Sequence, residues 1–141
     1  MTKGILDGVS RLIADAFPEY PVYGDSRVAQ GLEAPCFFVE LGEYSRRPLP
    51  CGFFGVRQAV DVVYFPEKRE DYKEMWDIGP RVLPLLEMLP LPGGAMARGV
   101  GLRCDVIDGL MHMRAVYKLR LRYTENPDLM GEIAVQTRLG R

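Results

Sequence analysis

Apolar side chains recur every three or four residues in two stretches of the chain, and this spacing predicts two amphipathic helices. The first stretch covers residues 2–17, where Thr2 can cap the helix and Pro18 ends it. Because its apolar residues form a single stripe, one face of this helix is expected to be buried. The residues of the stripe are Ile5, Leu6, Val9, Leu12, Ile13 and Ala16.

The second helix is expected to begin at Glu70 or Asp71, either of which can cap it. Pro80 and Pro84 lie inside this helix, and a proline removes a backbone hydrogen bond and clashes with the preceding turn. A kink or two short helices are therefore expected. The predicted inner face carries Tyr72, Met75, Trp76, Val82, Leu83 and Leu86.

Strand patterns occupy much of the remaining chain. The segments with alternating or β-rich character are 21–24, 36–41, 52–65, 100–106 and 110–123. Asp108-Gly109, between the last two segments, is typical of a two-residue hairpin turn. The order helix, strand, strand, strand, helix, strand, strand predicts an α+β fold, in which a mainly antiparallel sheet packs against two helices in two layers.

The linker between the second and third predicted strands, residues 46–50, holds two arginines and two prolines. This composition argues against a tight hairpin turn. Phe53 and Phe54 follow at the tip of the expected hairpin, where no core is evident for them to enter. Burial in the chain's own core and contact with a partner are both open for this pair.

The strand 110–123 sorts its residues onto two different faces, because successive side chains of a strand point to opposite sides. Its odd-numbered positions are apolar and are expected to face the core. The even-numbered positions include His112, Arg114, Lys118, Arg120 and Arg122. In a solvated sheet face such cations pair with acids on neighbouring strands, for example Asp105 or Glu40.

Composition narrows the class of protein. The 141 residues include 18 Lys or Arg and 19 Asp or Glu, and this net charge of −1 argues against a general nucleic-acid binder. With 48% hydrophobic residues, a single domain is expected over residues 1–123, followed by a C-terminal arm, 124–141.

No apolar stretch approaches the roughly 20 residues of a membrane span, and no secretory signal is evident. Synthesis in the cytoplasm and no membrane partner are expected.

The titratable residues do not form a recognisable catalytic set. His112 is the single histidine, and its sequence neighbours supply neither metal-ligand spacing nor a nucleophile. Cys36, Cys51 and Cys104 are widely spaced and odd in number, which favours reduced, buried thiols. No catalytic residue, metal or cofactor is therefore expected.

Several short motifs, taken together, resemble one protein family. They are Tyr23-Gly24-Asp25, Val28-Ala29-Gln30-Gly31-Leu32, Pro35-Cys36-Phe37-Phe38-Val39, Asp61-Val62-Val63-Tyr64-Phe65-Pro66 and Val106-Ile107-Asp108-Gly109-Leu110-Met111-His112. In their order and spacing, residues 3–123 are similar to the tail terminator (tail completion) proteins of phages and prophages of Gram-positive bacteria.

The resemblance implies a structural subunit that assembles in the host cytoplasm into a ring of six copies. The ring would cap the head-proximal end of the tail tube in the virion, stop tube growth and bind head-completion or connector proteins. Its partners would be further copies of itself, the tail tube protein and the head-completion protein, with DNA only as cargo. The residues expected to carry subunit or tube contacts are Val28, Gln30, Gly31, Leu32, Arg46, Arg47, Phe53, Phe54, Arg114, Lys118, Arg120 and Arg122.

For the cations of the last strand, an acidic patch on a neighbouring subunit is favoured over the DNA channel, because cations held on phosphate would add friction to passing DNA. Two other functions are alternatives. A head-side connector or stopper protein would share the ring geometry but purify with filled heads. A small ligand-binding or enzymatic α+β domain would have a deep polar pocket.

Overall fold

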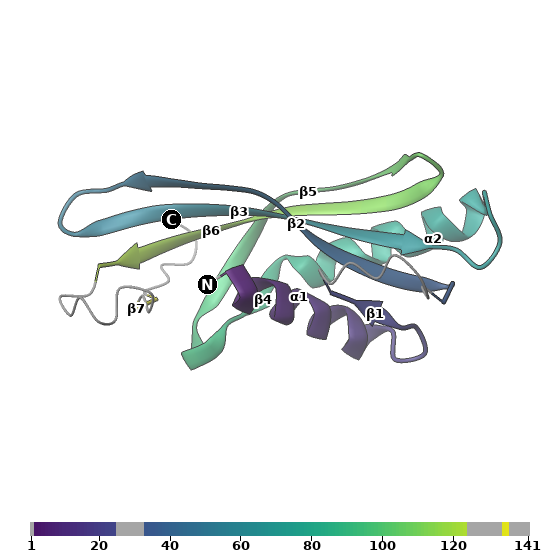
Figure 1. Cartoon of the computed structure of the whole chain (residues 1–141), viewed down its shortest axis with the longest axis horizontal. Helices are drawn as coiled ribbons and strands as arrows, with labels where there is room; N and C mark the ends of the chain where they lie inside the picture. Colours follow the sequence, from purple (N-terminus) through teal and green to yellow (C-terminus); the bar gives the residue numbers. More distant parts are fainter. Residues whose placement is uncertain (1, 25–32, 124–133, 136–141) are drawn as a thin grey trace.

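The computed structural model describes residues 2–24, 33–123 and 134–135 (Figure 1). In these residues the predicted α+β class is confirmed. The elements in chain order are α1 (Thr2–Ala16), β1 (Val22–Tyr23), β2 (Cys36–Pro48), β3 (Phe53–Phe65), α2 (Tyr72–Val82), the 3₁₀ helix η1 (Leu83–Leu86), β4 (Met88–Pro90), the 3₁₀ helix η2 (Pro92–Gly94), β5 (Met96–Ile107), β6 (Leu110–Arg122) and β7 (Ala134–Val135).

The strands of the described residues form one sheet in the order β1-β2-β3-β6-β5-β4, and β7 pairs with the end of β6. β1 lies parallel to β2, whereas the other pairs are antiparallel. The element order departs from the expected one at two places. β4 lies between the second helix and the last hairpin, and β7 lies in the expected arm, whose residues 124–133 and 136–141 are outside the described residues.

One hydrophobic core joins both helices to one face of the sheet. Figure 1 shows α1 and α2 on the same side of the sheet. The fully buried residues of the α1 stripe are Ile5, Val9 and Ile13. The odd-numbered residues from Met111 to Leu121 of β6 are buried, as predicted. Among them, Tyr117 donates a hydrogen bond from its hydroxyl to the backbone carbonyl of Leu86 at 2.8 Å, which ties β6 to η1.

Two hairpins connect the long strands. Asp108 and Gly109 join β5 to β6 with φ angles of 53° and 78°, as the predicted two-residue turn requires. Residues 49–52 join β2 to β3. Residues 46–48, which were expected to belong to the linker, instead continue β2 and pair with β3, so the loop is shorter than expected.

A β-bulge in β2 changes which of its residues lie on the core side of the sheet. Leu41 pairs with Val60 and Tyr44 pairs with Gln58, so β2 holds one more residue than β3 between these two pairs. Odd-numbered residues of β2 lie on the core side before the bulge, and even-numbered residues lie on that side after it. The alternation of β2 cannot therefore be extended through residues 42–43.

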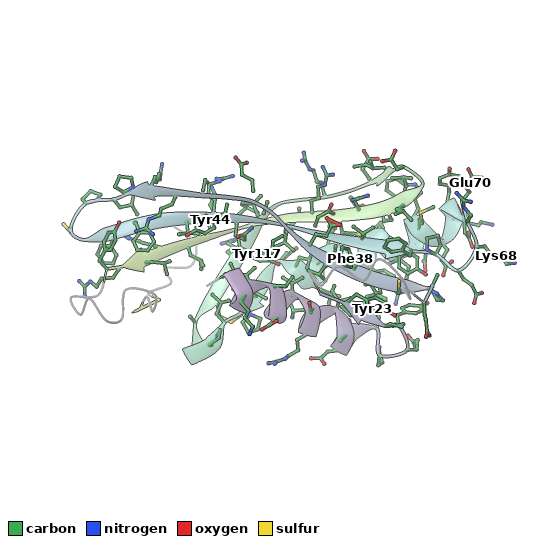
Figure 2. The ribbon with its side chains drawn as sticks, viewed as in Figure 1. Tyr23, Phe38, Tyr44, Lys68, Glu70 and Tyr117 are labelled. Atoms are coloured by element: carbon green, nitrogen blue, oxygen red, sulfur yellow. The ribbon has the colours of Figure 1, made fainter. Side chains whose placement is uncertain are left out.

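Gln58 holds this bulge in place from inside the sheet. Its side chain is buried, and Nε2 donates hydrogen bonds to the carbonyl oxygens of Gly42 at 3.1 Å and Ala59 at 2.9 Å. The register places Gln58 opposite Tyr44 on β2 and Tyr117 on β6, in one row across three strands. Figure 2 labels the two tyrosines of this row. The amide therefore satisfies backbone carbonyl groups at the position where the strands extend beyond the helices.

A second bulge lies in β5. Val100 pairs with Val116 and Arg103 pairs with Arg114, so β5 has one extra residue between these pairs. An unbroken alternation over the predicted strand 100–106 would place Val100 and Leu102 on the same face, and the bulge prevents this. Val100 lies on the outer face of the sheet, the face opposite to the helices.

The second helix begins as predicted, because Oδ1 of the N-cap Asp71 accepts a hydrogen bond from the backbone N–H of Glu74 at 3.2 Å. The helix includes Pro80 and ends at Val82, where the 3₁₀ helix η1 follows with Pro84 in its first turn. Two short helices were one of the expected outcomes. Among the described residues, no helix is long and apolar enough to cross a membrane.

Replacing Gln58 by Leu is expected to lower the free energy of unfolding by about 1–3 kcal/mol, because the carbonyls of the bulge lose their donor while the volume changes little. Arg57→Leu is the matched control, since Arg57 is the exposed neighbour on the opposite face, and its effect should stay within about 0.5 kcal/mol. Denaturant unfolding of both variants measures the difference. Equal stability of Gln58→Leu and the unaltered chain would contradict this role.

Candidate interaction surface

Beyond the bulge, β2, β3 and β6 continue as a three-stranded ribbon that reaches away from both helices (Figure 1). We call residues 44–58 and 117–122 the extension. Its core-side row includes Phe54, Val56 and Leu121, which are buried. The extension is therefore a packed element of the fold, and its opposite face is the outer face of the sheet.

The outer face of the extension is strongly basic. Its exposed cations are Arg47, Arg57, Lys118, Arg120 and Arg122. Lys118 lies directly opposite Arg57 on β3 and Arg98 on β5, so three cations form one row across the sheet. Like charges that face each other across strands reduce stability. Within the described residues, none of these cations forms an ion pair.

Phe53 lies between two of these cations. The guanidinium carbons of Arg120 and Arg122 lie 4.6 and 5.0 Å from the centre of its half-buried ring. These distances are typical of cation–π contacts, which orient the guanidinium groups and leave their charge unneutralised. The arrangement suits the binding of a surface that carries carboxylates or aromatic rings.

Phe54 belongs to the chain's own core, so burial is the outcome for this member of the aromatic pair. It is fully buried, and the guanidinium carbon of Arg46 lies 3.9 Å from its ring centre. Arg46 also donates a hydrogen bond from Nη2 to the hydroxyl of Tyr123 at 2.7 Å. This hydrogen bond raises the pKa of Arg46, so the side chain stays charged. Phe54 and Arg46 are thus engaged within the chain, and Phe53 is the half-buried member of the pair.

Arg114 has an acidic partner that the sequence pattern did not reveal. Its Nε lies 3.8 Å from Oδ2 of Asp61, and the same oxygen lies 2.8 Å from Nδ1 of His112. Asp61 stands opposite Arg114 in the β3–β6 register. The acids considered from sequence were Glu40 and Asp105. Of these, Asp105 instead accepts a hydrogen bond from the backbone N–H of Val106 at 2.8 Å. Asp61 is therefore a partner of both Arg114 and His112 within the chain.

The described residues contain no group of three side chains arranged to hold a metal ion. Cys36 is buried and Cys104 is partly buried, and burial raises the pKa of both thiols, which keeps them protonated. Cys51 is exposed in the loop between β2 and β3, so the expectation of buried thiols fails for this residue. All three are free cysteines.

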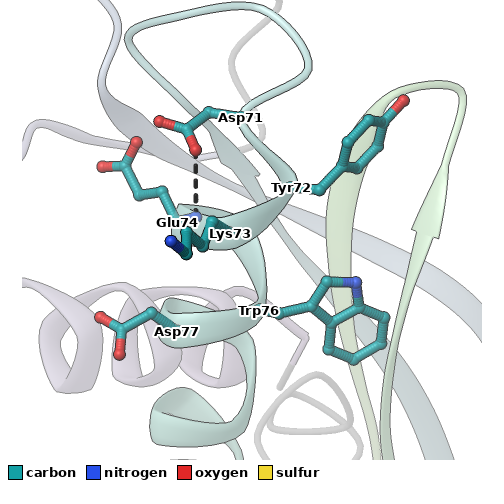
Figure 3. A pocket seen from close by; sticks show the side chains of 6 residues that line it. All are labelled: Asp71, Tyr72, Lys73, Glu74, Trp76 and Asp77. Atoms are coloured by element: carbon teal, nitrogen blue, oxygen red, sulfur yellow. Dashed lines mark hydrogen bonds between the residues drawn. The ribbon is translucent and has the colours of Figure 1, made fainter.

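A second surface lies at the start of α2, at the end of the molecule opposite to the extension (Figure 1). Tyr72 and Trp76, one helical turn apart, are each 47% exposed. Their predicted place on the inner face is wrong, because Met75 and Ile78 hold that face and the two rings lie to one side of it. Figure 3 shows both rings projecting to the same side of the helix, with Asp77 projecting to the other side.

The first turn of α2 is anchored to the sheet by a buried hydroxyl. Tyr64 of β3 donates a hydrogen bond to Oε1 of Glu74 at 2.6 Å. Burial, together with this carboxylate, raises the pKa of Tyr64, so the hydroxyl remains a donor. A shallow pocket at this surface is lined by Asp71, Tyr72, Lys73, Glu74, Trp76 and Asp77. It combines two aromatic rings with three carboxylates and Lys73, and the aromatic faces suit a cationic partner.

Four residues that were expected to make contacts are not placed by the structure. Val28, Gln30, Gly31 and Leu32 lie outside the described residues. Arg57 and Arg98 also lie on the basic outer face of the sheet, although neither was among the residues expected to make contacts. They come from two other strands, and only the register of the sheet brings them next to Lys118.

Residues 4–128 match a family model described as phage tail terminator protein. The match covers most of the chain and includes α1, the long strands and α2. No curated protein matches the chain significantly.

Replacing Tyr64 by Phe is expected to lower the free energy of unfolding by about 1–3 kcal/mol, because the carboxylate of Glu74 loses a strong hydrogen bond. Tyr72→Phe removes the hydroxyl of an exposed tyrosine nearby and should leave stability unchanged. Thermal unfolding measures both effects. If the two variants lose equal stability, the hydrogen bond does not anchor the helix.

Proposed function

The chain belongs to a family of phage tail terminator proteins, and we propose that it caps the head-proximal end of the tail tube as a ring of six copies. The family match over residues 4–128 is the observation that carries this proposal. A structural role in the phage tail follows from the family itself. The ring, the position at the head-proximal end and the joining of head and tail are the parts we propose.

Termination has a simple physical basis. A closed ring of identical subunits requires a heterologous interface, in which one surface of a copy meets a different surface of the next. The two faces of such a ring differ. One face can bind the last layer of tail tube protein, while the other offers no site for a further layer and binds the head-completion protein instead.

The exposed surfaces of the chain support a role in assembly. The outer face of the extension presents unpaired cations within the described residues, and the start of α2 presents two exposed aromatic rings. Surfaces of this kind are typical of protein interfaces, which are enriched in arginine and aromatic residues. In this proposal the partners are further copies, the tube protein and the head-completion protein, and DNA passes through as cargo.

Phages that lack this chain should form tails of abnormal length that fail to join heads, because nothing stops the addition of tube protein. Supplying the chain in trans should restore normal tails, and Lys3→Ser, on the exposed side of α1, serves as a matched control that restores them too. Phe53→Ser should restore them poorly, because Phe53 orients Arg120 and Arg122. Electron microscopy of tail lengths measures the result. Normal tails attached to heads without the chain would exclude the terminator role, and tails complete in length but headless would favour the head-side connector.

A further inference from the structure

The charge of the chain is divided sharply between two parts. The extension carries six cations and no acidic residue. Because the whole chain has a net charge of −1, the remaining residues carry −7. A molecule with such separated charge repels a second copy that approaches extension to extension. It attracts one that approaches with its oppositely charged part.

The cations on the outer face are positioned for a partner outside the chain. Arg57, Lys118 and Arg98 form a row of like charge, and Arg120 and Arg122 flank Phe53. Repulsion between these like charges lowers the free energy of unfolding unless an acidic surface covers them. In the described residues no acid is paired with these cations, so they are available to an acidic surface.

The start of α2 combines two exposed aromatic rings with three carboxylates and one lysine. Trp76 and Tyr72 expose aromatic faces, on which guanidinium groups stack well. The side chain of Asp77 is 70% exposed, and its one ion pair in the described residues is with Arg81 at 3.5 Å, on the same helix. Such an exposed pair is weak and is readily exchanged for a better partner.

We propose that the extension of one copy docks on the start of α2 in a second copy of this chain. Arg120 and Arg122 stack on Trp76 and Tyr72, while Asp77, which projects to the other side of α2, strengthens the attraction at longer range. The two surfaces lie at opposite ends of the molecule, so this contact joins copies head to tail (Figure 1). The inference rests on the proposed ring, for which it names the subunit contact.

Two charge variants and their mixture test the contact. Arg120→Glu with Arg122→Glu reverses the extension, and Trp76→Ser with Asp77→Lys removes the receiving surface. Each variant alone should self-associate at least about tenfold more weakly than the unaltered chain. An equimolar mixture should form one-to-one dimers and nothing larger, because one intact extension meets one intact α2 surface. Sedimentation velocity in solution and binding to purified tail tubes measure the association.

Matched controls separate a specific contact from general effects. Lys3→Glu with Arg11→Glu changes the net charge equally on exposed positions of α1, and Met88→Ser removes another exposed apolar side chain. Both should associate like the unaltered chain. Arg120→Lys with Arg122→Lys keeps the charge but loses the planar stacking group, so an intermediate loss is expected. Thermal unfolding of each variant confirms that it is folded.

Several outcomes would overturn the inference. It fails if either charge variant associates normally, if the mixture does not form dimers, or if the unaltered chain associates neither in solution nor on tubes. Retained association with lost binding to a DNA duplex in Arg120→Glu with Arg122→Glu would assign the basic face to DNA instead. The tail-length experiment is independent of these results. Normal termination by the Trp76→Ser, Asp77→Lys variant would reject this contact and leave the terminator role intact.

Discussion

The pairing of β3 with β6 is the constraint on which the rest of the structure depends. The two strands pair without interruption from Phe53 opposite Arg122 to Tyr64 opposite Met111, at the centre of the sheet. Because side chains alternate between faces, a slip of one residue would move the buried row of β6 into solvent and its cations into the core. Burial of one face therefore fixes the position of every charge on the other.

The same register sets the electrostatics of the outer face. It brings Asp61 next to Arg114 and His112 near the middle of the sheet, where the carboxylate offsets the charge of Arg114. Towards the end of the sheet it places Arg57 opposite Lys118, so that two like charges face each other. The hydrophobic core tolerates this local repulsion, since each exposed pair of like charges costs little compared with a buried side chain. A basic surface can thus be maintained on a stable sheet.

The two bulges shape the surfaces that leave the core. In β2, the bulge held by Gln58 turns Arg46 towards the core side and Arg47 towards the outer face. The two adjacent arginines therefore lie on opposite faces. Arg46 packs over the ring of Phe54, and Arg47 lies on the basic outer face. The extension, which includes the two central strands of the sheet, therefore presents its charges on a packed element of the fold. The proposed contact between copies uses this element.

The sequence alone determined the α+β class, the first helix, the cap at Asp71, the Asp108-Gly109 turn and the two faces of β6, since each depends on neighbours within a few residues. The family resemblance was also present in the order of short motifs and is confirmed by the match to residues 4–128. Only the tertiary structure decided that Phe54 is buried, that Asp61 is the partner of Arg114, and that Trp76 is exposed. Strand register and bulges join residues far apart in the chain, and a bulge reverses the alternation from which faces are predicted, so local patterns do not contain this information.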